Sequence, residues 1–143
     1  MRLFLMAATA AGFAFATVLM MADEAAAVQD MPTTINGVET VCTGVGSAKD
    51  DPRWSSYPVK IVLATSGGAN LANAHVSLTK GSQEVAALDC DAPWILFKPP
   101  AGSYTATASL IGGTRSAHAN FTTSGSGQKE VTLVFPRGEA PTQ

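Results

Sequence analysis

The stretch that decides the fold is "DAPWILFKPPAGSYTATA", which runs from Asp91 to Ala108. A short apolar run ends at Pro99 and Pro100, which lack the N–H group that a sheet requires, so strand pairing must stop there. Gly102 then permits a positive φ that a larger residue resists. Beyond it, apolar and hydroxyl-bearing residues alternate strictly, which predicts a strand with one buried and one exposed face. A strand, a sharp break and a second strand are typical of an antiparallel sandwich.

Two aromatic residues in this stretch have predicted structural roles. Pro93 restrains the backbone ahead of Trp94, and we expect the indole to be buried over one end of the sandwich. We expect the ring of Tyr104 to pack inward and its hydroxyl to bind a nearby backbone group, as corner tyrosines do. The alternative for Trp94, together with Trp54, is an exposed platform for a sugar or a peptide.

The same pattern extends outward over residues 58–136. Short β-rich runs are separated by Gly, Asn, Ser or Pro at intervals of roughly 8–12 residues, the spacing of a sandwich. Seven strands are expected, with almost no helix, because no long window has an apolar period of 3.6. The residues expected to face the core are Val59, Ile61, Leu63, Ala74, Val76, Leu78, Tyr104, Ala106, Ala108, Leu110, Ala117, Ala119, Phe121, Val131, Leu133 and Phe135.

The rest of the chain is expected to lie outside this sandwich. Residues 28–57 predict an extension with a short hairpin around Asn36-Gly37, a strong turn pair, and then a loop or a short helical turn. Residues 137–143 predict a disordered tail.

The N-terminus predicts export. A positive start is followed by an uncharged apolar run from Leu3 to Met21, and Ala25 and Ala27 supply the small residues of a signal-peptidase site. We expect cleavage after Ala27, which removes 27 of the 143 residues, leaves 116, and sends the chain to the periplasm or the medium. A retained anchor is the alternative, because about 18 apolar residues can span a bilayer, but the cleavage site favours export. The residue directly after the cut is not a cysteine, which argues against a lipoprotein.

Two cysteines, Cys42 and Cys90, remain after cleavage. In an oxidising compartment we expect them to form a disulfide. Their wide separation is unlike the ligand spacing of a zinc site, and the chain has no C-x-x-C redox motif.

Charge excludes two classes of partner. The mature chain has a net charge of −1, and its basic residues are scattered. Nucleic acid needs clustered Lys and Arg to replace counterions, and a membrane surface needs a basic amphipathic helix. We therefore expect neither nucleic acid nor, after cleavage, a membrane as partner; the sequence does not predict an oligomeric state.

Several motifs resemble a known family. Strand residues Leu71, Ala74, Val76 and Leu78 and the signature residues Pro100, Gly102, Tyr104 and Ala108 resemble the carboxypeptidase regulatory-like domain, a small transthyretin-like β-sandwich. Pro93-Trp94, with Gly44-Val45-Gly46 upstream, is similar to a group of stand-alone bacterial members of unknown activity. The resemblance covers residues 42–136 and implies a seven-stranded, transthyretin-like antiparallel sandwich, but no particular chemistry. The transthyretin-like fold includes hydroxyisourate hydrolases, whose catalytic pattern is absent from this sequence.

The candidate reactive groups are few. His75 and His118 are expected on outward faces and would make half a metal site if they met. Asp89 and Asp91 share a face of an extended strand, yet two carboxylates fall short of the six to eight oxygens that calcium prefers. Asp50-Asp51 is a second acidic pair, expected to be solvated. Nothing in the chain predicts a cofactor.

The sequence therefore predicts an exported, non-catalytic β-sandwich that binds or supports another component of the cell envelope. One alternative is a small periplasmic hydrolase or metal-dependent enzyme that uses His75 and His118, or Asp89 and Asp91. Another is a carbohydrate- or peptide-binding module that uses Trp94.

Overall fold

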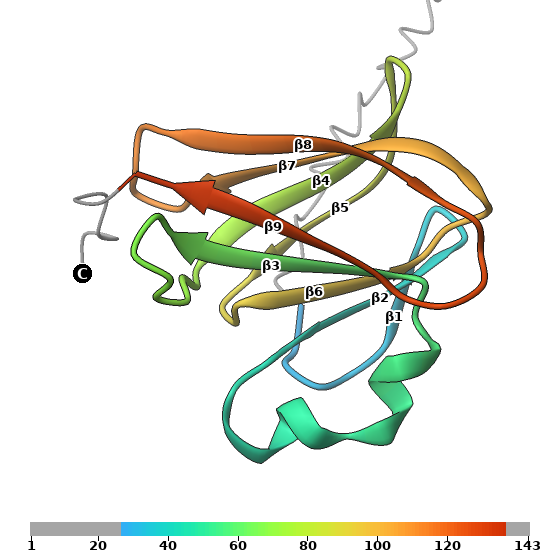
Figure 1. Ribbon diagram of the computed structural model, residues 1–143, viewed down its shortest axis with the longest axis horizontal. Helices are drawn as coiled ribbons and strands as arrows, with labels where there is room; N and C mark the ends of the chain where they lie inside the picture. The colour runs from blue at the N-terminus through green and yellow to red at the C-terminus, as the bar shows by residue number, and fades with distance from the viewer. Residues whose placement is uncertain (1–26, 137–143) are drawn as a thin grey trace, which may run out of the picture.

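A computed structural model describes residues 27–136, which form two β-sheets packed face to face (Figure 1). The predicted signal peptide, apart from Ala27, and the predicted tail 137–143 lie outside the described residues. The all-β sandwich expected from the sequence is confirmed. No helix within residues 27–136 is long and apolar enough to cross a membrane.

Nine strands and two short 3-10 helices make up the described chain. They are β1 (Thr33–Ile35), β2 (Val38–Thr43), η1 (Gly46–Asp50), η2 (Pro52–Ser56), β3 (Val59–Thr65), β4 (Ala74–Lys80), β5 (Gln83–Cys90), β6 (Trp94–Lys98), β7 (Gly102–Leu110), β8 (Ser116–Thr123) and β9 (Lys129–Phe135). All seven strands expected beyond residue 58 are present, as β3 to β9.

The larger sheet has the order β1-β2-β6-β3-β9, and the smaller has the order β5-β4-β7-β8. Every neighbouring pair is antiparallel except β3 and β9, which run parallel from Val59↔Lys129 to Thr65↔Phe135. The chain visits the whole smaller sheet between these two strands, which gives the long crossover that a parallel pair requires.

The segment 28–57, which the sequence separates from the sandwich, contributes two strands to it. The hairpin forms at Asn36-Gly37 as expected, but β2 continues into the larger sheet and pairs with β6 from Glu39↔Lys98 to Thr43↔Trp94. Its apolar side chains explain this position: Val38, Val41 and Cys42 are all buried, and only another strand can satisfy the backbone groups between them.

The core lies between the sheets and is built by alternation. Fourteen of the residues expected to face it are buried, and the remaining two, Ala117 and Ala119, pack against it while partly exposed. On β6 the inward residues are Ile95 and Phe97, both fully buried. The hydroxyl of Tyr104 donates to the carbonyl of Pro100 at 2.6 Å, as a corner tyrosine is expected to.

The predicted disulfide joins the two sheets. Cys42 on β2 and Cys90 at the end of β5 are bonded, with their Cα atoms 5.6 Å apart. The bridge closes the side of the sandwich where β1, β2 and β5 meet, while β8 and β9 lie side by side at the opposite side.

A second, smaller apolar cluster lies on the outer face of the larger sheet. Val41 and Leu96 point away from the main core and are covered by Trp54 and Tyr57 from the η2 region. Trp54 donates its indole N–H to the carbonyl of Ala48 at 2.8 Å, which ties η2 to η1. The two short helices therefore form a partial third layer beneath the larger sheet (Figure 1).

Candidate functional site

Trp94 lies on the outer face of the larger sheet, which corrects the expectation that it caps the core. Strand alternation decides this position: Ile95 and Phe97 enter the core, so Trp94, Leu96 and Lys98 must point outward. The indole is partly exposed and belongs to neither apolar cluster. The sequence could not assign this face, because the unbroken apolar run in "WILFK" does not show which residues point inward.

Two neighbours fix the Trp94 ring. Gly44, with φ of 106°, lies so close that a Cβ atom on it would be 2.6 Å from Trp94 Cγ. The ammonium group of Lys60 lies 3.5 Å from the ring centroid, a cation–π contact. Lys60 also pairs with Glu130 at 3.4 Å. The indole is therefore held in one orientation, and the ammonium group of Lys60 lies over its ring.

Beside this ring is a hollow of about 180 Å³, which we call the tryptophan hollow. Its lining residues come from η1, η2, β3, β6 and the turn before β9; they are Lys49, Asp50, Asp51, Trp54, Ser55, Lys60, Trp94, Leu96 and Gln128. Small-molecule pockets usually occupy about 300–1,000 Å³. The tryptophan hollow is smaller than that and has room for one or two side chains of a partner.

Asp51 builds one wall of the tryptophan hollow. Its carboxylate accepts the backbone N–H of Arg53 at 2.9 Å, which caps η2, and binds the guanidinium at 2.7 Å. These bonds to Arg53 lower the pKa of Asp51 and raise that of the guanidinium. Of the acidic pair Asp50-Asp51, the second residue is thus engaged in structure.

Tyr57 forms the far end of the same layer. It is 2% exposed, and its hydroxyl donates to Glu39 at 2.6 Å. Burial, and then this hydrogen bond, raise the pKa of the phenol well above its usual value. The ammonium of Lys98 lies 4.6 Å from the ring and 3.8 Å from Glu39.

His75 and His118 both lie on the smaller sheet, but on strands separated by β7. His75 faces Ser109 and His118 faces Thr107, so the two imidazoles occupy different rows. His75 pairs instead with Asp89, with Nδ1 and Oδ1 2.7 Å apart across β4 and β5. The two histidines therefore do not form a joint site.

No group of three or more metal-ligating side chains occurs among residues 27–136. Asp89 is bound to His75, and Asp91 lies beyond the end of β5. Neither the histidines nor these two carboxylates converge on a common point with a third ligand.

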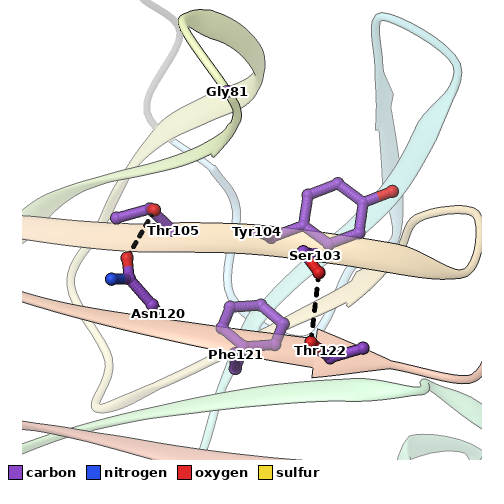
Figure 2. Close-up of a pocket in the computed structure, with 7 residues that line it drawn as sticks. All are labelled: Gly81, Ser103, Tyr104, Thr105, Asn120, Phe121 and Thr122. Carbon is purple, nitrogen blue, oxygen red and sulfur yellow. Dashed lines mark hydrogen bonds between the residues drawn. The ribbon is translucent and has the colours of Figure 1, made fainter.

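A second hollow, of about 420 Å³, lies against β7 and β8 (Figure 2). Ser103 and Thr105 face Thr122 and Asn120 across the two strands, joined by hydrogen bonds of 3.1 and 2.7 Å. Tyr104 and Phe121 also line it, and their rings are stacked at 6.0 Å. The turn between β4 and β5, at Gly81, borders it on the far side.

A third hollow, of about 330 Å³, is at the edge where β1 approaches β5. Its lining is mainly apolar and includes Val28 and Met31, each at least 60% exposed. Ala27 starts the described chain here, and its N–H donates to the carbonyl of Asp89 at 3.1 Å.

Comparisons with known proteins add little. No protein-family model matches the chain, and no curated protein matches it. Among solved structures, 5-hydroxyisourate hydrolase from Klebsiella pneumoniae is similar over 56% of this chain and 90% of its own, with 20% identity and a TM-score of 0.43. That similarity is too low to transfer an activity or a site.

Sequence reasoning found some of these features and missed others. It named Trp54 and Trp94 together as a possible platform, and the structure brings both to one hollow. It missed Lys60 and Gln128, because only the register of β3 and the turn before β9 place them there. It also missed the pairing of His75 with Asp89, although both were singled out.

Proposed function

We propose that this chain is an exported, non-catalytic binding module of the carboxypeptidase regulatory-like type, which contacts another protein of the cell envelope. The observation that carries the proposal is the tryptophan hollow. It combines a fixed, partly exposed indole with two ammonium groups and two carboxylates, and its volume suits side chains of a polypeptide. Aromatic residues ringed by polar groups are the usual anchors of protein interfaces.

The sandwich beneath the hollow supports this function, because its lining residues are held by the fold. Gly44 and Lys60 fix Trp94, while Gln128 donates to the carbonyls of Trp54 and Tyr57 at 2.8 and 3.2 Å. A preformed site avoids the ordering cost that weakens flexible surfaces. The disulfide and the predicted signal peptide support an extracytoplasmic location.

Site-directed photocrosslinking tests the proposal. A photoreactive phenylalanine derivative at Ser55, an exposed residue on the rim of the hollow, should give a discrete adduct in cells that express the full chain. The same group at Ser82, in the exposed turn after β4, is the control. The adduct at Ser55 should be lost in Trp94→Ala. No adduct at Ser55, or equal adducts at both positions, would refute the proposal.

The pair formed by His75 and Asp89 favours one second candidate, a small hydrolase. A carboxylate that binds Nδ1 fixes the imidazole and leaves Nε2 as a base, as in other acid–base sites. Ester hydrolysis that is abolished by Asp89→Asn and retained in His118→Ala would support this candidate. Activity that persists in Asp89→Asn, or that is lost when the protein is purified further, would exclude it.

A further inference from the structure

The outer face of the smaller sheet carries rows of short hydroxyl and amide side chains. Strand register sets the rows, since each residue faces its partner directly on the next strand. One row is Ser103–Thr122, the next is Glu84–Thr79–Thr105–Asn120, and the third is Ala87–Ser77–Thr107–His118. A fourth row, Asp89–His75–Ser109–Ser116, completes the face toward the other end of the sheet.

This face lacks the long charged side chains that usually cover an exposed sheet. The first and third rows contain no Lys, Arg, Asp or Glu. The second row ends in Glu84 on the edge strand β5, and in the fourth the single carboxylate is bound to His75. Glu84 lies at the margin, opposite Thr79 beside a bulge in β4 and β5. The face therefore has mostly short side chains and few charges, which weakens the electrostatic basis for binding a polyanion or a polycation.

The hydrogen-bonding groups of the face are numerous and partly available. Each hydroxyl has one donor and two acceptor sites, and the contacts Ser103–Thr122 and Thr105–Asn120 use only part of that capacity. The oxygen of Asn120 accepts from Thr105, so its NH₂ group is directed away from that bond (Figure 2). Neighbouring strands are about 4.8 Å apart and same-face residues about 6.8 Å apart along a strand, so these groups form a regular grid.

The hollow of about 420 Å³ lies at one end of this grid, where Ser103, Thr105, Asn120 and Thr122 line it. Its volume is within the usual range for small-molecule sites, about 300–1,000 Å³. The turn at Gly81 borders the hollow (Figure 2). The arrangement accommodates one unit of a chain in the hollow and further units along the face.

From these observations we propose that the outer face of the smaller sheet is a binding site for a neutral, linear polysaccharide. Such a chain is uncharged, presents alternating donor and acceptor hydroxyls at short intervals, and can lie flat over adjacent rows. This site is separate from the tryptophan hollow, which is on the other sheet.

An NMR titration of the mature, disulfide-bonded chain tests the proposal. The probes are cellohexaose, laminarihexaose, maltohexaose and N-acetylated chitohexaose, with heparin as a charged control. At least one neutral hexasaccharide should shift the amide signals of β7 and β8 and saturate them as its concentration rises, while those of Lys60 and Trp94 remain unchanged. Shifts confined to the tryptophan hollow, or none with any neutral probe, would overturn the proposal.

Matched variants assign the site. Thr107→Lys places a long cation in the middle of the grid and should weaken the binding of the responding hexasaccharide at least tenfold. Thr132→Lys makes the same substitution at an exposed position of β9, on the other sheet, and should leave the dissociation constant unchanged. Thr122→Lys, at the hollow, provides a second test if Thr107→Lys does not fold. Unchanged binding in a folded variant of either residue would refute the site. Failure to obtain the photocrosslink from Ser55 would refute the protein partner proposed for the tryptophan hollow, and would not affect the polysaccharide site.

Discussion

At the residue scale, Gly44 and Trp94 show how two residues far apart in the sequence constrain each other through one contact. The pairing Thr43↔Trp94 places Gly44 directly beside the indole. With φ of 106° and a side-chain position blocked by the ring, only glycine fits there. This contact gives a physical reason for the presence of both Gly44-Val45-Gly46 and Pro93-Trp94 in one chain.

We expect Gly44→Ala to destabilise the fold by about 2–5 kcal/mol, since the left-handed backbone and the overpacked ring each add a penalty. Gly46→Ala is the matched control: its φ is 62° but nothing lies within 4 Å of a Cβ atom, so only about 1–2 kcal/mol is expected. Urea unfolding measures both values. Equal losses in the two variants would contradict the predicted clash with Trp94.

Tyr57 and Tyr104 predict a decrease in stability at alkaline pH. Burial raises the pKa of both phenols, so the folded protein keeps their protons at a pH where the unfolded chain releases them. The stabilisation is therefore complete below about pH 10, the unfolded value, and is lost as pH rises above it. Tyr57→Phe should make this decline shallower in urea unfolding measured from pH 8 to 11. An identical slope in the variant and the wild type would refute the role of Tyr57.

At the scale of elements, η1 and η2 convert the outer face of a sheet into a small apolar cluster. Trp54 is 4% exposed and covers Val41 and Leu96, which would otherwise meet water. Because the same layer forms the tryptophan hollow, the stability of these short helices and the shape of the candidate site are coupled.

We expect Trp54→Ala to cost about 3–5 kcal/mol, the usual loss for truncating a buried tryptophan. Ser55→Ala, on the exposed side of η2, should change the free energy of unfolding by no more than about 0.5 kcal/mol. Chemical denaturation of both variants measures the difference. A loss in Trp54→Ala as small as that in Ser55→Ala would show that the outer cluster does not stabilise the fold.

Local pattern explains what the sequence could predict at this scale. Strands β3 to β9 follow from alternation and turn residues, because each has one apolar face and a clear break at its ends. The place of β2 in the sheet could not be found this way, since its partner β6 lies more than fifty residues later. The grid of hydroxyls could not be predicted for the same reason. Alternation assigned Thr105 and Thr107 to the outward face, but only the strand register aligns them with Asn120 and His118.

At the scale of the whole molecule, the disulfide between Cys42 and Cys90 clamps the two sheets on one side. The connection 124–128 joins β8 to β9 on the other side. The sandwich is thus covalently linked at both of its open margins, which suits a rigid module whose binding faces must keep their shape.

Replacing both cysteines by alanine should lower the free energy of unfolding by about 4 kcal/mol, because the bridge closes a loop of roughly fifty residues in the unfolded chain. Urea unfolding with and without reductant measures this effect. The reductant should destabilise the wild type and leave Cys42→Ala/Cys90→Ala unchanged. A wild type insensitive to full reduction would contradict the prediction.

The parallel pairing of β9 with β3 has a consequence for the newly made protein. β3 begins at Val59, yet the strand that covers its free edge is the last one described, and it also supplies the buried residues Leu133 and Phe135. While the ribosome is still adding residues, the nascent chain therefore has an open edge and an incomplete core. A polypeptide that stops short of residue 129 leaves its apolar interior exposed to water, so premature termination before β9 yields a substrate for proteases and not a shortened working module.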